Sequence, residues 1–224
     1  MAETVKKESP EKFYEMFIAE QNMVGTALGF SRRGKIPFAS TFAAFFSRAF
    51  DQIRMSQYAK PNIKFIGSHA GVSIGEDGAS QMALEDIAMF RTLLDCTVLY
   101  PSDAVSAEKL TSLAAAHFGN VYIRTTRAET PVIYENEEDF KIGGLKIHPG
   151  KKSTIIVIGA GITLHEALKA QSELAEKNIG IDVVDLYSIK PISPELVKIA
   201  NRAKAIVTVE DHFEEGGIGE AVRT

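Results

Sequence analysis

The sequence predicts an α/β protein made of two three-layer αβα domains with mainly parallel sheets. Short apolar runs alternate with longer amphipathic runs along most of the 224 residues, which is typical of strands joined by helices. A polar stretch with several glycines and prolines, residues 129–150, interrupts this alternation, and the alternation resumes near Ser153. We therefore expect one domain over residues 1–140 and a second over residues 141–224.

The first domain is expected to begin with a strand and to continue as alternating helices and strands. Apolar runs predict strands over residues 13–18, 35–39, 63–67, 96–100 and 121–125. Apolar residues at helical spacing predict helices over residues 19–30, 42–58, 83–94 and 103–117. The glycine-containing segment 69–81 is expected to be a long loop after the third strand.

The second domain repeats the pattern on a smaller scale. Strands are predicted over residues 154–158, 181–186 and 205–209, and helices over residues 163–177 and 193–202. The connector between the domains, residues 129–150, is expected to hold a few short strands.

The composition narrows the classes of function. There are 25 Lys and Arg residues against 29 Asp and Glu, so the net charge of −4 argues against a nucleic-acid-binding surface. No apolar run reaches the roughly 18 residues of a membrane span. Cys96 is the single cysteine, which excludes an intrachain disulfide and favours a reducing compartment. We expect a cytoplasmic protein with no nucleic-acid or membrane partner.

Two glycine motifs suggest a dinucleotide site and a metal loop, but neither pattern is complete. Gly159-Ala160-Gly161 follows an apolar run, but Leu164 stands where a dinucleotide fingerprint needs its third glycine. We interpret it as a tight strand-to-helix turn capped by Thr163. The loop Gly75–Gly78 is acidic, yet it lacks the alternating oxygen ligands of a calcium loop. The sequence therefore predicts no metal ligands in this chain.

Polar residues gather where predicted strands end. His69, Asp77 and Gln81 lie on one loop after a predicted parallel strand, where α/β proteins place ligands, so we expect a site there. Glu20 stands where the first helix begins. It is either a helix N-terminal carboxylate favoured by the helix dipole or a carboxyl group among apolar neighbours, with a raised pKa; the sequence leaves both open.

The aromatic and basic candidates have simpler interpretations. Phe42, Phe45, Phe46 and Phe50 recur at helical spacing, which predicts core packing, although Phe42 sits at the mouth of a loop where it can also stack on a ligand. Arg124 and Arg127 flank the end of a predicted strand. A phosphate is one partner for such side chains, but the default for a single arginine is a surface position.

Several longer runs resemble one enzyme family. The run Ile18–Gly25 resembles the transketolase segment that carries the cofactor-activating glutamate. The runs Pro37–Arg54 and Gly67–Arg91 are similar to animal-type transketolases almost residue for residue, and Ile123–Glu129 and Val209–Val222 match further signatures of the family. The resemblance covers nearly the whole chain, so it is far more specific than any glycine pattern.

The resemblance implies two domains of a three-domain enzyme, cut at both ends. Residues 1–140 would form the domain that binds the pyrimidine ring of thiamine diphosphate, with its first strand missing, and residues 141–224 an incomplete C-terminal domain. The family's magnesium or calcium ion and the cofactor's diphosphate bind another domain through a Gly-Asp-Gly motif, which is not found in this sequence. A homodimer, or a separate N-terminal subunit, would complete the site.

The resemblance also implies residue roles. Glu20 would hydrogen-bond the aminopyrimidine ring and activate the cofactor, and Phe42 and Phe45 would form the aromatic wall of its pocket. Gln81 would lie beside the reacting two-carbon unit and also contact the cofactor. Asp77 would bind a sugar hydroxyl, while His69 and Arg127 would hold the phosphate of the sugar phosphate substrates. Arg48 stands where some relatives have an aromatic residue, which leaves its role open.

Other functions remain as alternatives. The expected reaction is the transfer of a two-carbon ketol unit from xylulose 5-phosphate to ribose 5-phosphate in the pentose phosphate pathway. Deoxyxylulose phosphate synthase and the β-subunit of a 2-oxoacid dehydrogenase share this domain pair and a matching glutamate. A non-catalytic fragment or partner subunit is the alternative of a different class, because no diphosphate motif is present.

Overall fold

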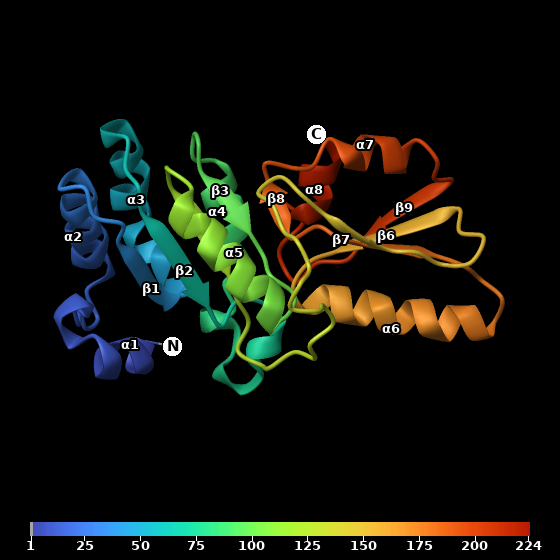
Figure 1. Ribbon diagram of the computed structural model, residues 1–224, viewed down its shortest axis with the longest axis horizontal. Coiled ribbons are helices and arrows are strands. Elements are labelled where there is room, and N and C mark those ends of the chain that lie inside the picture. The colour runs from blue at the N-terminus through green and yellow to red at the C-terminus, as the bar shows by residue number, and fades with distance from the viewer. Residues whose placement is uncertain (1) are drawn as a thin grey trace.

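Two β-sheets lie beside each other in the chain, each with helices on its faces (Figure 1). The computed structural model describes residues 2–224. In the first sheet the strand order is β1-β2-β4-β3-β8, and in the second it is β5-β7-β6-β9. The first four strands of the first sheet run parallel, and β8 pairs antiparallel with β3. In the second sheet β7, β6 and β9 are parallel and β5 is antiparallel.

The strands of the two sheets are short and mostly buried. Those of the first sheet are β1 (Phe38–Phe42), β2 (Lys64–Ser68), β3 (Thr97–Leu99), β4 (Val121–Arg124) and β8 (Ser188–Lys190). Those of the second sheet are β5 (Lys146–His148), β6 (Ile155–Gly159), β7 (Asp182–Asp185) and β9 (Ala205–Thr208).

Helices cover both faces of each sheet. One face of the first sheet packs against α2 (Glu20–Arg32), α3 (Phe50–Ser56) and α4 (Asp86–Arg91), and the other against α5 (Ala104–Ala116). The second sheet lies between α6 (Ile162–Glu176) on one side and α7 (Glu195–Ala200) with α8 (Ile218–Arg223) on the other (Figure 1). This arrangement confirms the predicted α/β class, in which each of two mainly parallel sheets lies between two layers of helices.

The largest apolar cluster runs through both halves of the chain. It joins Phe65, Phe90 and Tyr122 around the first sheet to Ile156 and Val184 in the second. The rings of Phe90 and Tyr122 stack with centroids 3.9 Å apart. Each buried aromatic or aliphatic side chain contributes about 1.5–3 kcal/mol to stability. The two sheets therefore pack against each other through a shared apolar core.

The chain before α2 differs from the prediction. Residues 13–18 form no strand, so the expected opening strand is wrong. The apolar side chains of Phe17 and Ile18 there are 86% and 82% exposed, and Phe17 has a positive φ of 52°. Alternating apolar residues suggested a strand, but no neighbouring strand pairs with them. A short helix, α1 (Ala2–Glu8), precedes this segment and was not predicted.

The segment predicted as one helix, residues 42–58, is instead broken. Phe42 ends β1, residues Ala43–Ala49 form a 3₁₀ helix, and α3 begins at Phe50. The strand predicted over residues 35–39 likewise starts later, at Phe38. A tight 3₁₀ turn changes which faces the four phenylalanines present, and this change shapes the candidate site.

Two further elements were missed, and one begins close to its predicted place. Strand β8 and helix α8 were both expected as loop. Helix α5 begins where predicted, because the side chain of Asp103 accepts a hydrogen bond from the Ser106 backbone N–H in a capping box. Among the described residues, no helix is both long and apolar enough to cross a membrane.

Candidate functional site

The candidate residues meet at the edge of the first sheet where its parallel strands end. The register pairs Phe42 of β1 with Ser68 of β2, and Gly67 of β2 with Arg124 of β4. The residues that follow these strands therefore leave the sheet side by side. This geometry places Phe42, His69 and the segment leading to Arg127 at one edge, as expected for ligand sites in α/β sheets.

Three aromatic rings form a stack at this edge. The ring of Phe42 lies parallel to that of Phe45, with centroids 5.4 Å apart, and its centroid lies 3.9 Å from that of His69. Phe45 is half-buried against a small cluster of alanines, while Phe46 is fully buried in the main core. The predicted core stripe is therefore divided: Phe46 serves the core, and Phe42 with Phe45 line the site.

His69 is held in an unusual conformation. Its φ of 60° lies in the left-handed region, which non-glycine residues seldom occupy and which recurs at binding sites. Its Nδ1 lies 3.0 Å from the hydroxyl oxygen of Ser68. Burial and the nearby Arg127 lower the pKa of His69, and Asp77 only partly offsets them. The ring is therefore neutral at neutral pH and available as a hydrogen-bonding partner.

Arg127 lies across the same loop from His69. Its Nη1 donates to Asp77 Oδ2 at 2.9 Å and to the carbonyl oxygen of Ile74 at 3.1 Å. The arginine side chain is 40% exposed, so solvent weakens these contacts and leaves part of the guanidinium free for a ligand. Asp77, predicted to bind a sugar hydroxyl, is thus paired with the arginine predicted to bind the phosphate, and the charge of that arginine also acts on His69.

An open pocket of about 410 Å³ lies beside Arg127, lined also by Ser73, Ile74, Glu76 and Ala128. The hydroxyl oxygen of Ser73 is one of two buried side-chain polar atoms among the described residues that lack a hydrogen-bond partner. An unpaired buried hydroxyl is costly, and because this atom is closed to solvent, a ligand oxygen would reach it only if the loop shifts on binding. Sequence reasoning missed Ser73, because a serine in a loop carries no signal of its own.

Glu20 and Arg48 form a second part of the site. Glu20 is the first residue of α2 and is only 7% exposed, so it combines the helix-start position of one expectation with the burial of the other. Its Oε2 lies 3.4 Å from Nη1 of Arg48, which projects from the same 3₁₀ helix as Phe45. The ion pair gives Arg48 a place beside the predicted catalytic carboxylate.

Gln81 ends a short 3₁₀ helix, Ala79–Gln81, which packs against the 3₁₀ helix Ala43–Ala49. Its backbone N–H donates to the carbonyl oxygen of Gly78, whose φ of 81° suits glycine. The side chain is half-buried. The loop from His69 to Gln81 therefore folds back onto the element that carries Phe45.

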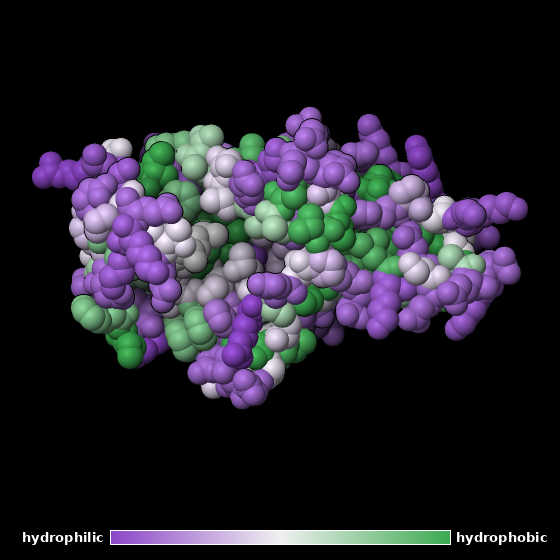
Figure 2. Space-filling view, turned by 60° about the horizontal axis from the view of Figure 1, so that its bottom comes forward, coloured by the Kyte–Doolittle hydropathy of each residue, from purple (hydrophilic) through white to green (hydrophobic). Residues whose placement is uncertain are grey.

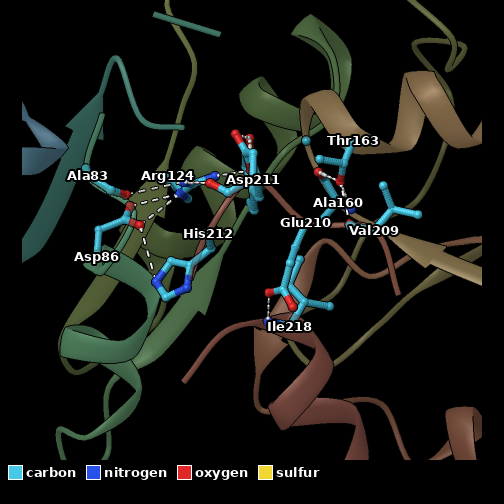
Figure 3. A network of polar contacts seen from close by, with 12 residues as sticks. Ala83, Asp86, Arg124, Ala160, Thr163, Val209, Glu210, Asp211, His212 and Ile218 are labelled. Carbon is cyan, nitrogen blue, oxygen red and sulfur yellow. Dashed lines mark hydrogen bonds and ion pairs between the residues drawn. The ribbon is translucent and has the colours of Figure 1, made fainter. Parts of the chain in front are cut away.

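Arg124 is not the surface residue that its sequence position suggested. It is fully buried, and its Nε donates to both carboxylate oxygens of Asp86 while its Nη1 donates to Asp211 Oδ1 at 2.7 Å (Figure 3). Its guanidinium also lies 4.6 Å from the centre of the Tyr100 ring. Burial opposes its charge, but Asp86, Tyr100 and Asp211 raise its pKa well above its usual value.

The glycine motif Gly159-Ala160-Gly161 forms the predicted tight turn between β6 and α6. Gly161 precedes α6 with a φ of 57°, and a Cβ atom there would lie 2.0 Å from the Tyr100 ring. The predicted cap is wrong: the helix is preceded by Gly161, and Thr163 lies inside its first turn, where its hydroxyl accepts a hydrogen bond from the Ala160 N–H. Cys96 is buried, as a small apolar residue would be. Within residues 2–224, no three His, Cys, Asp or Glu side chains are grouped to hold a metal ion.

Comparison with protein families matches both halves of the chain. Residues 1–132 match the model of the transketolase pyrimidine-binding domain, and residues 143–224 match that of the transketolase C-terminal domain. Transketolase-like protein 2 of Mus musculus is 59% identical over 227 residues, covering 99% of this chain and 36% of the relative. Transketolase of Homo sapiens is 54% identical, again over 99% of this chain and 36% of the relative.

Two solved structures of transketolases have a fold similar to that of this chain. A split-gene transketolase, described as an inactive β4 tetramer, superposes with a TM-score of 0.89 at 40% identity, covering 97% of this chain and 71% of that one. Transketolase of Campylobacter jejuni shares the fold, with a TM-score of 0.74 at 19% identity over 94% of this chain and 37% of that one. The chain spans about a third of the length of its curated relatives, and over that span it belongs to the transketolase family.

Proposed function

We propose that this chain supplies the pyrimidine-binding half of a transketolase active site. The reaction is the thiamine diphosphate-dependent transfer of a two-carbon ketol unit from a ketose phosphate such as xylulose 5-phosphate to an aldose phosphate such as ribose 5-phosphate, within the pentose phosphate pathway. The observation that carries the proposal is the buried Glu20 carboxylate at the start of α2, which faces the 3₁₀ helix that holds Phe45 and Arg48.

The side chains present suit the pyrimidine ring of the cofactor. Phe42 and Phe45 offer half-buried aromatic faces that stack on a flat heterocycle, and Glu20 offers a carboxylate that holds a ring proton. Thiamine diphosphate, when bound, supplies the carbon that accepts and passes on the two-carbon unit. Glu20 would fix the ring and its proton, and Gln81 would orient the reacting unit by hydrogen bonding.

The rest of the edge suits a sugar phosphate. Arg127 lines an open pocket and lowers the pKa of His69, which lies at the same sheet edge, and these two residues would hold the phosphate group. Asp77, now paired with Arg127, would take a sugar hydroxyl. Binding the phosphate at a distance from the reacting carbonyl positions that carbonyl for reaction.

The site needs a partner to close it. Phe17 and Ile18, just before Glu20, are almost fully exposed, and hydrophobic residues lie open on the face shown in Figure 2. We infer that a second subunit covers this surface, either a copy in a homodimer or a separate N-terminal subunit. The diphosphate site and its magnesium or calcium ion would come from the diphosphate-binding domain, which would belong either to a longer chain that forms the homodimer or to the separate N-terminal subunit.

A second candidate is a chain that is inactive alone. The split-gene transketolase that superposes on this chain is described as an inactive tetramer of its β-chain. We infer the same for residues 1–224: no transketolase activity and negligible cofactor affinity without the diphosphate-binding part.

Turnover of xylulose 5-phosphate with ribose 5-phosphate tests the proposal, in the presence of thiamine diphosphate and magnesium. We expect none for the chain alone, and activity once a diphosphate-binding part is added. Within the completed enzyme, Glu20→Gln should lower turnover by about two orders of magnitude or more while the cofactor still binds, because the amide cannot share the ring proton.

Glu195→Gln is the matched control, because Glu195 is also the first residue of a helix, α7, but lies in the other half of the chain. It should retain full activity. Activity of Glu20→Gln within a few-fold of the unmodified enzyme would rule out the proposed role, and turnover by the chain alone would show that the cofactor binds elsewhere.

A further inference from the structure

The segment Val209–His212 links the second sheet to the first. On the side of the second sheet it is anchored firmly: the Val209 N–H donates to the carbonyl oxygen of Ile158, and the Val209 carbonyl accepts from the Thr163 hydroxyl. The carboxylate of Glu210 accepts from the backbone N–H groups of Ile218 and Gly219 at the start of α8 (Figure 3). The segment therefore has a fixed position within its own domain.

From this anchor, Asp211 reaches the end of β4. Its side chain accepts a hydrogen bond from Arg124 Nη1 at 2.7 Å, and its backbone carbonyl accepts from Arg124 Nη2 at 3.0 Å. Arg124 is the last residue of β4 and lies three residues before Arg127. Two charge-assisted contacts at a buried site hold this strand end in place.

The other carboxylate oxygen of Asp211 touches the loop after β2. A Cβ atom on Gly71 would lie 1.6 Å from Asp211 Oδ2, so this position admits only glycine. Gly71 follows His69 by two residues, and its N–H donates to the Met82 carbonyl while the Ala70 N–H donates to the Thr125 carbonyl at 3.0 Å. One carboxylate thus abuts both segments that carry the candidate phosphate ligands.

We propose that Asp211 is a positioning residue that fixes His69 and Arg127 relative to each other, so that the second domain sets the affinity of the candidate site for a phosphate group. The inference rests on the proposed function in taking these two residues as phosphate ligands. Asp211 itself is buried behind the loop and does not contact the ligand. Its role explains why a domain without candidate ligands matters to the site, because small displacements of ligands weaken binding strongly.

The test uses the 224-residue chain with two readouts. Inorganic phosphate, titrated against the NMR signal of the His69 ring, gives a dissociation constant. Amide hydrogen exchange at Ala70 and Gly71 reports on loop order without any ligand. Asp211→Ala should raise the phosphate dissociation constant by about five- to tenfold and accelerate exchange at both amides. Asp211→Asn, which keeps an oxygen for Arg124, should fall between Asp211→Ala and the unmodified chain and serves if the alanine variant does not fold.

Asp185→Asn is the matched control, since Asp185 is a buried aspartate of the same domain that contacts neither segment. It should leave both readouts unchanged. A folded Asp211→Ala chain with unmodified phosphate affinity and exchange would overturn the proposal. If exchange accelerates but Arg127→Ala leaves the phosphate affinity intact, the positioning role is supported and the phosphate site of the proposed function is overturned.

Discussion

Arg124 and Arg127 lie three residues apart at the end of one strand, and they differ in nearly every physical respect. Arg124 is fully buried, and its guanidinium contacts two carboxylates, two backbone carbonyls and an aromatic ring. Arg127 is 40% exposed, with one close carboxylate and an open pocket beside it. The first arginine has no capacity left for a ligand, whereas the second retains several free donors.

The comparison shows how one strand end serves stability and binding at once. A buried arginine with all its donors used fixes the backbone, and it does so at a desolvation cost that only complete pairing offsets. An exposed arginine contributes little to stability but is free to bind an anion. Substitutions that separate these two roles should therefore have opposite profiles in stability and in ligand binding.

The largest expected effect is on the buried arginine. Arg124→Ala leaves Asp86 and Asp211 buried without a cation, so the free energy of unfolding should fall by about 3–5 kcal/mol. Arg127→Ala should change it by about 0.5 kcal/mol or less. Denaturant titration of both variants measures the contrast. Similar losses in the two variants would show that burial does not separate these arginines.

Asp185 sharpens the comparison, because it is a buried carboxylate without a nearby guanidinium. It accepts hydrogen bonds from Ser102 and Tyr134, yet burial raises its pKa to about 7. The unfolded chain releases this proton near pH 3.8, so the native protein loses stability as pH rises from about 4 to 7.

Asp185→Asn should remove that dependence and change the stability difference across the window by on the order of 2–4 kcal/mol. Unfolding measured at several pH values tests this. An unchanged pH profile in Asp185→Asn would mean that Asp185 titrates normally.

Arg127→Ala should mainly weaken the use of phosphorylated substrates. In the completed enzyme it should lower kcat/KM for phosphorylated donors. The loss corresponds to about 1.5–3 kcal/mol of transition-state binding, because one charged partner of the phosphate is removed. The small unphosphorylated donor hydroxypyruvate should be affected less. Arg54→Ala, which removes another exposed arginine paired with an aspartate, is the matched control. Equal losses with both donors would take Arg127 out of the phosphate site.

The smallest expected effect is that of Ser73→Ala. Its buried, unpaired hydroxyl would gain a partner only if ligand binding shifts the loop that carries it. In that case phosphorylated donors should lose about 0.5–1.5 kcal/mol of transition-state binding, and the free protein should lose no stability. Steady-state kinetics and thermal unfolding together separate these outcomes. If the melting temperature of Ser73→Ala falls while its kinetic constants are unchanged, Ser73 stabilises the fold and does not bind the ligand.

The sequence predicted elements best where the cause was local. The strand ending at Ser68 and helix α5 with its Asp103 cap depend on neighbouring residues, and both lie close to the predicted places. The environment of Arg124 depends on partners 38 and 87 residues away, so no local pattern predicts it. One signal was nevertheless present: an arginine inside an apolar strand needs buried acidic partners.

The candidate site likewise combines features that the sequence predicted with features that only the structure reveals. The resemblance marked Glu20, His69 and Arg127 for a ligand site, and the structure brings the last two to one edge because parallel strands end there. The left-handed backbone of His69 and the unpaired hydroxyl of Ser73 appear only in three dimensions. Their contribution to ligand binding is therefore a prediction from geometry.

Strand β8 makes the two halves poor candidates for exchange between homologous enzymes. Residues Ser188–Lys190 come from the second half of the chain, yet they complete the first sheet by pairing with β3. A chimera joined near residue 140 would place one parent's β8 against the other parent's β3. Recombination within this family should therefore succeed only where both parents keep the same strand pairing, so residues distant in sequence must be inherited together.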